Sequence, residues 1–152
     1  MFPFFRKKNK FFSDEDAHLI VKAIRQAEKR TSGEVRVFVE SKCRWMDAID
    51  RAAELFFSLK MEKTEQRNAV LVYIAMKDHQ LAVFGDEGIH NKVGTAYWNN
   101  VVAEMISSFN KNDYAKGIAE CVIQVGDALT EHFPYDSDTD KNELPDDIVF
   151  GH

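Results

Sequence analysis

Residues 69–75, Ala-Val-Leu-Val-Tyr-Ile-Ala, form the stretch that decides the fold, because they contain no charged side chain. An apolar run of this length, rich in β-branched residues, is typical of a central strand that helices cover on both faces. Residues 34–40, Glu-Val-Arg-Val-Phe-Val-Glu, alternate in polarity and predict a second strand. The sequence therefore indicates a sheet with a buried centre.

Helical patterns surround these two strands. Ser13 precedes three acidic residues, which predicts an N-cap and the first turn of a helix. Residues 46–60 show helical spacing between the two strands, and further helical patterns cover residues 90–109 and 114–133. A short turn at residues 77–79 leads into a third strand at 80–84. The chain is thus predicted to be an α/β domain.

The order of these elements predicts the geometry of the sheet. A strand–helix–strand crossover makes strands 34–40 and 69–75 parallel, and the short turn makes 80–84 antiparallel to 69–75. The first two strands therefore begin at the same edge of the sheet at which the third ends. At that edge we expect the loop with Glu62 and Glu65 to meet the loop with Asp86 and Glu87.

Charge and hydropathy exclude several classes of protein. The net charge of −5 arises in a tail from Pro134 onward, which has six acidic residues and one basic residue, Lys141. The remaining body is balanced and has no basic stripe, which argues against nucleic-acid binding. No apolar run approaches the length that spans a bilayer, so we expect no stable membrane insertion. Residues 1–8 place aromatics before basic residues, the reverse of a secretion signal, so we expect a cytoplasmic protein.

The sequence contains no recognisable catalytic nucleophile or base. Its two cysteines and five histidines show no metal-type spacing and form no disulfide framework. No arginine stands beside the acids of residues 86–87 to clamp a phosphate group. We therefore assign no catalytic residue from the sequence.

Several ordered segments resemble the TPM domain, a family named after a thylakoid-lumen protein, a photosystem-associated protein and a receptor accessory protein. The segments are residues 31–37 (Thr-Ser-Gly-Glu-Val-Arg-Val), 67–72 (Arg-Asn-Ala-Val-Leu-Val), 83–89 (Val-Phe-Gly-Asp-Glu-Gly-Ile), and Phe109 with Asp113-Tyr114 and Gly117-Ile118. The resemblance covers residues 12–133 and leaves an N-terminal tail at 1–11 and an acidic tail at 134–152. The chain looks like a stand-alone bacterial form of the family.

The resemblance implies both a fold and a ligand. The fold is an αβα sandwich with a small mixed sheet of three to four strands and helices on both faces. The ligand is a divalent metal ion, usually calcium, near the loop after the third strand. Acid phosphatase activity is attributed to plant members of the family, and other members are linked to photosystem repair or receptor assembly.

Asp86 and Glu87 are the leading candidates for metal ligands. Hard cations require several oxygen ligands, and glycines at 85 and 88 would let the backbone fold around an ion. The alternative is that the two acids cap the following helix. Asp113 matches an acidic position of the family and is either a further ligand or the N-cap of the helix that follows. Glu65 is a weaker candidate, chosen because its loop should cross the loop after the third strand.

Two functions are compatible with these observations. The first is a cation-binding module, with calcium as the expected ion, whose occupancy alters the surface presented to a protein partner that the sequence does not identify. The second is a metal-assisted acid phosphatase, in which the cation would polarise a phosphoryl oxygen or activate water. The absence of a recognisable nucleophile or base favours the first.

Overall fold

The structure is a computed structural model that describes residue 9 and residues 11–135 and 148–152. The chain forms four helices and four strands in these residues. Helix α1 spans Asp14–Glu28, strand β1 Glu34–Glu40, helix α2 Ala48–Ser58, strand β2 Ala69–Ala75 and strand β3 Gln80–Gly85. Helix α3 spans Glu87–Asn110, helix α4 Tyr114–His132 and strand β4 Ile148–Phe150.

The sheet has the order β3-β2-β1-β4. Strands β1 and β2 are parallel, with Glu34 opposite Ala69, and β3 is antiparallel to β2. These directions confirm the geometry expected from the sequence. We call the end of the sheet at which β1 and β2 begin the amino end, and the end at which β1, β2 and β4 finish the carboxyl end.

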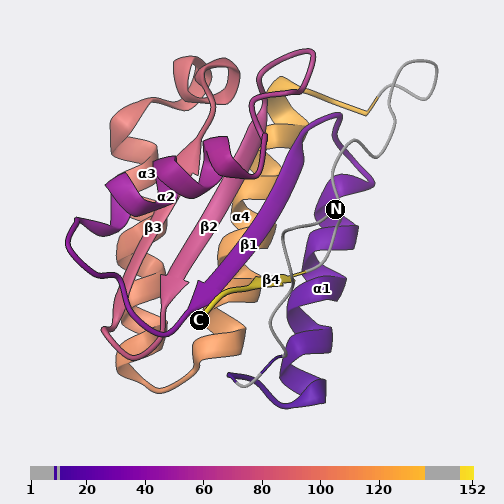
Figure 1. Ribbon diagram of the computed structural model, residues 1–152. Helices are drawn as coiled ribbons and strands as arrows, with labels where there is room; N and C mark the ends of the chain where they lie inside the picture. Colours follow the sequence, from indigo (N-terminus) through magenta and orange to yellow (C-terminus); the bar gives the residue numbers. More distant parts are fainter. Residues whose placement is uncertain (1–8, 10, 136–147) are drawn as a thin grey trace, which may run out of the picture.

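Helices cover both faces of the sheet, as Figure 1 shows. Alternate residues of β1 and β2 pack against α1, α3 and α4 on one face, in a cluster that includes Val37, Val72 and Ile118. The opposite residues, Phe38 and Tyr73 among them, pack against α2 on the other face. The fold is therefore an αβα sandwich around an open mixed sheet, as the family resemblance implies.

Strand β4 is the part of the fold that the sequence analysis missed. Residues 148–150 were placed in a surface tail, yet they pair with β1 in parallel, with Phe38 opposite Val149. Val149 is fully buried, so this short strand belongs to the core. The acidic segment 136–147 and most of the N-terminal tail lie outside the described residues. None of the described helices is both long enough and apolar enough to cross a membrane.

The caps of two helices explain where they start. The Ser13 hydroxyl accepts a hydrogen bond from the Asp16 amide at 3.1 Å, as predicted. Helix α3 begins at Glu87, three residues earlier than predicted, because Asp86 serves as its N-cap. Gly94, with φ 80° and ψ 170°, interrupts α3 with a kink that hides the start of the helix from a periodicity search. The early start of α3 places the acidic loop directly at a helix N-terminus.

Candidate functional site

The two acidic loops meet at the amino end of the sheet, as the connectivity predicted. The Gly88 amide donates to the Arg67 carbonyl at 2.8 Å, and the Asp86 amide donates to the Ala69 carbonyl at 2.9 Å. A Cβ atom on Gly88 would lie 2.1 Å from the Gln66 carbonyl oxygen, so only glycine permits this contact between the loops. We call this region, residues 62–68 and 86–88, the loop junction.

Arg67 is the residue that joins the loops electrostatically. Its Nε and Nη2 atoms donate to both carboxylate oxygens of Asp86, at 2.7 and 2.8 Å. Its Nη1 lies 2.8 Å from Glu87 Oε1. Hydrogen bonding to Asp86 raises the pKa of Arg67, and the charges of Glu87 and Glu62 act in the same direction. The expectation that no arginine stands beside these acids is therefore wrong, because Arg67 reaches them from the neighbouring loop.

Asp86 is the most constrained acid of the loop junction. Only 3% of its surface is exposed, and its Oδ1 also accepts the Glu87 amide at 2.8 Å as the N-cap of α3. A buried carboxylate needs such partners, because water no longer solvates it. Asp86 thus performs the capping role that was the alternative to metal binding, and it does so while paired with a guanidinium group.

Glu62 contributes an unsatisfied oxygen to the same place. Its Oε1 atom is buried and accepts no hydrogen bond from any described residue. An acceptor of this kind normally has a partner, since burying it alone costs free energy. Glu62 acts electrostatically on Arg67, so the guanidinium lies within the influence of three carboxylates. The loop junction therefore has an excess of negative charge, with four acidic residues against two basic ones, Lys63 and Arg67.

The other two predicted ligands do not join this group. Glu65 is exposed and makes no ion pair or hydrogen bond within the described part of the chain. Asp113 is exposed at the start of α4, and its side chain forms no cap hydrogen bond. Helix α4 is roughly 28 Å long at 1.5 Å per residue, and its far end lies at the amino end of the sheet, where Phe133 accepts the Ser32 amide. Helix α4 runs along the sheet (Figure 1), so its start, with the N-cap residue Asp113, lies at the carboxyl end, away from the loop after β3.

The loop before β2 contains two glutamates, and the structure buries an oxygen of Glu62 while it leaves Glu65 exposed. Glu62 and Glu65 are both in the loop before β2, and nothing in the local sequence separates a half-buried side chain from an exposed one. Arg67 directly precedes the Asn68-Ala69 start of the strand, and this position at the shared edge was the available signal for its role. Among the described residues, no three His, Cys, Asp or Glu side chains are arranged to hold a metal ion.

A second polar cluster lies at the carboxyl end of the sheet, and the sequence analysis did not identify it. Glu40 accepts hydrogen bonds from Arg51 at 2.9 and 3.0 Å, and from the Tyr73 hydroxyl. Burial raises the pKa of Tyr73, and its hydrogen bond to Glu40 adds to the shift. This cluster lies under a surface pocket of about 670 Å³. The two ends of the sheet therefore carry separate charged clusters.

Three solved structures show the fold of this chain. The BA42 protein from the psychrophilic bacterium Bizionia argentinensis is 36% identical over 95% of this chain and 99% of its own, with a TM-score of 0.85. The N-terminal domain of cg2496 from Corynebacterium glutamicum is 13% identical, with a TM-score of 0.62 over 93% of this chain and 82% of its own. The N-terminal domain of a P. gingivalis protein is 16% identical, with a TM-score of 0.67 over 84% and 83%.

The low identity of the last two proteins makes them evidence for the fold alone. A comparison with curated proteins gave no match. The family model described as the TPM domain matches residues 6–128, which is most of the chain. The matched range includes both loops of the loop junction and all of β1, β2, β3 and α3. The chain therefore belongs to the TPM domain family.

Proposed function

We propose that this domain is a cation-modulated interaction module. A divalent ion, with calcium as the expected ion, binds at the loop junction. The observation that carries the proposal is the buried, unpartnered Oε1 of Glu62, whose charge acts on Arg67, the residue that pairs with Asp86 and Glu87. Calcium is bound by carboxylate and carbonyl oxygens, and these residues supply both kinds. A cation placed there would satisfy the orphaned oxygen and reduce the excess negative charge.

Binding must involve a competition with Arg67. The guanidinium group already occupies both oxygens of Asp86, so the ion has to displace it from at least one of them. Arg67 has φ 52°, a left-handed conformation that is uncommon for residues other than glycine. Release of Arg67 from Asp86 would allow this backbone strain to relax. The proposed ligands are Glu62, Asp86 and Glu87. No three such side chains are arranged to hold an ion in the described residues, so the ion would have to bring these carboxylates together as it displaces Arg67. Glu65 and Asp113 are outside the proposed set.

The loop junction has a route by which ion binding would alter a surface. Gln66 Nε2 and Asn68 Nδ2 both donate to the Ser32 hydroxyl, at 3.1 and 3.2 Å. Ser32 in turn donates its amide to the Phe133 carbonyl at the end of α4. A movement of residues 62–68 would therefore reach the connection between α1 and β1 and the end of α4. A ligand shifts such an equilibrium only by its preference for one conformation, which calcium has if it replaces Arg67.

The test is a calcium titration by calorimetry and amide NMR on single-residue variants. We expect calcium to shift the amides of residues 62–68 and 86–90, and Glu62→Gln to weaken binding by about tenfold or more. Glu65→Gln is the matched control, because it removes an exposed carboxylate from the same loop. Arg67→Gln should tighten calcium binding, since it removes the competing cation.

Three outcomes would contradict this proposal. They are the absence of any saturable calcium signal, an equal effect of Glu62→Gln and Glu65→Gln, and weaker calcium binding by Arg67→Gln. The same samples are tested for hydrolysis of a generic phosphomonoester with calcium, magnesium and manganese. Hydrolysis that Asp86→Asn abolishes would favour the metal-assisted acid phosphatase over the interaction module.

A further inference from the structure

The pocket at the carboxyl end of the sheet lies where open α/β sheets bind ligands. Its lining includes Glu40 at the end of β1, Lys42 just after it, Lys77 shortly after β2 and His152 shortly after β4. All three parallel strands therefore contribute to its wall. Small-molecule sites in open α/β sheets occur outside the carboxyl ends of the strands, and a volume of about 670 Å³ is in the range of such sites.

The floor of the pocket is held by hydrogen bonds. Arg51 makes two hydrogen bonds to Glu40 and also pairs with Glu54, so the two acids that line the pocket share one guanidinium group. The loop above the floor is fixed as well. The Lys77 amide donates to the Ser41 carbonyl at 2.7 Å, and the Cys43 amide donates to Asp78 at 2.8 Å. The site is therefore preformed on its lower side.

The rim of the pocket carries three basic side chains, Lys42, Arg44 and Lys77. None of them makes an ion pair with a described residue. The chain as a whole has a net charge of −5, so a basic cluster is contrary to its average surface. Cations that lack an ion-pair partner among the described residues, placed around a preformed pocket, favour an anionic ligand.

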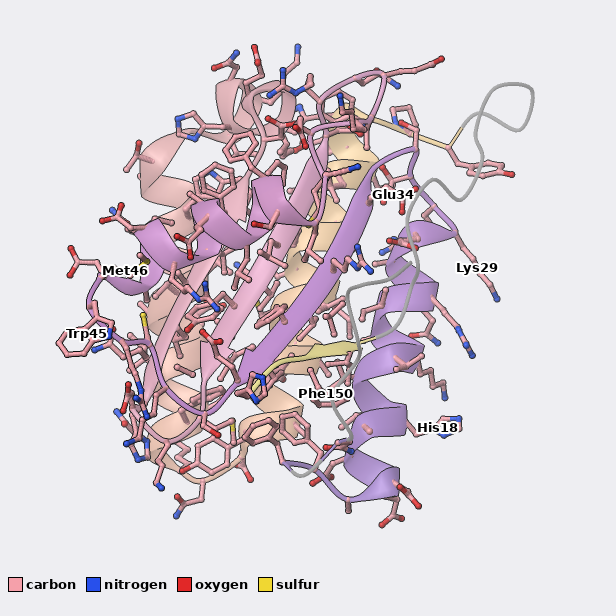
Figure 2. All side chains as sticks on the ribbon, in the orientation of Figure 1. His18, Lys29, Glu34, Trp45, Met46 and Phe150 are labelled. Atoms are coloured by element: carbon pink, nitrogen blue, oxygen red, sulfur yellow. The ribbon has the colours of Figure 1, made fainter. Side chains whose placement is uncertain are left out.

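Trp45 lies over the same pocket in an unusual conformation. Its side chain is 96% exposed, and Figure 2 shows it projecting from the loop next to Met46. Its φ of 71° is strained for a bulky residue. Backbone strain of this kind is concentrated at functional sites, where the surroundings hold a residue in place for a ligand. A fully exposed indole beside basic residues offers a surface on which a planar ring can stack.

We propose that this pocket binds a small ligand that joins an oxyanion to a planar ring, the chemistry of a nucleotide. The oxyanion lies between Lys42, Arg44 and Lys77. The ring lies against Trp45. The site is separate from the loop junction, because the two are at opposite ends of seven-residue strands.

ADP is the probe, and adenosine and pyrophosphate are its two halves. We expect ADP to bind saturably by calorimetry, to shift the amides of residues 41–47 and 77, and to change the fluorescence of Trp45. Adenosine and pyrophosphate should each bind at least about tenfold more weakly. Trp45→Leu should weaken the binding of ADP but not that of pyrophosphate. Lys42→Ser and Lys77→Ser should weaken the binding of both ligands.

The matched control is Lys63→Ser, which removes an exposed lysine at the amino end of the sheet and should leave ADP binding unchanged. No saturable ADP binding, or amide shifts confined to other regions, would overturn the proposal. Pyrophosphate binding as tight as that of ADP would overturn the role of Trp45. An unchanged affinity in Lys42→Ser and Lys77→Ser would overturn the oxyanion site.

Discussion

At the scale of single residues, the environment of a side chain determines its chemistry more than its type does. Glu62 and Glu65 are the same residue three positions apart, yet one has a buried oxygen and the other is exposed. The two cysteines differ in a similar way, since Cys121 is buried in α4 and Cys43 is half-buried in the loop after β1. The burial of an individual side chain therefore allows its effect on the stability of the protein to be predicted.

The thiol of Cys121 should make the protein less stable at alkaline pH. Burial raises its pKa from 9.0 to about 12, and the charge of Glu104 acts in the same direction. The contribution of this thiol to the free energy of unfolding is therefore constant below pH 9. It is lost as the pH rises from 9 to 12, because in that range the thiol releases its proton only in the unfolded protein. The loss is about 1.4 kcal/mol per pH unit over this window.

Urea unfolding of the protein and of Cys121→Ala measures this effect. At about pH 8 the variant should be the less stable of the two because it leaves a small cavity, and at about pH 11 the difference should shrink or reverse. Burial raises the pKa of Tyr97, and Cys121 contributes to that shift, so both proteins are compared in a Tyr97→Phe background. A difference that does not change with pH would contradict the assignment.

At the scale of elements, the sequence pattern predicted the four helices and the three longer strands. It did not predict the short strand β4. Strands β1 and β2 are long and patterned, and both were found within the correct bounds. Strand β4 has three residues, too few for a period to be recognised. Its place in the sheet depends on pairing with β1, a contact that is distant in the sequence.

Strand β4 should contribute substantially to stability despite its length. Val149 is fully buried against Phe38 and the α2 face, so Val149→Ala removes apolar contact that nothing refills. We expect the free energy of unfolding to fall by about 2 kcal/mol. Ile123→Ala is the control, because Ile123 is 43% exposed on α4 and alanine favours helix. Equal urea midpoints for Val149→Ala and the unaltered protein would show that β4 is not part of the core.

At the scale of the whole molecule, the sheet separates two charged clusters. Asp86 pairs with Arg67 at the amino end, and Glu40 pairs with Arg51 and Tyr73 at the carboxyl end. The strands between them have seven residues, which places the clusters roughly 20 Å apart at 3.3 Å per residue. The α/β core lies between them and is packed on both faces.

Substitutions at the two ends should therefore act independently. Asp86→Asn and Glu40→Gln should each destabilise the protein, and the double variant should equal their sum within about 0.5 kcal/mol. The comparison pair is Asp86→Asn with Glu62→Gln, which share Arg67 and should deviate from additivity. Urea unfolding of all the variants gives the interaction terms. A larger deviation for the distant pair than for the adjacent pair would contradict the separation of the two sites.

The sequence by itself determined the class of the fold, the direction of three strands and the meeting of two acidic loops. These features follow from local hydrophobic period and from connectivity, both of which are written along the chain. Only the tertiary structure decided that Arg67 holds Asp86, that Glu62 rather than Glu65 faces the loop junction, and that Asp113 is at the other end. It also brought Glu40, Arg51 and Tyr73 together under a basic pocket. The reason is physical: burial and ion pairing depend on which loops face each other in space, and the local sequence does not contain that information.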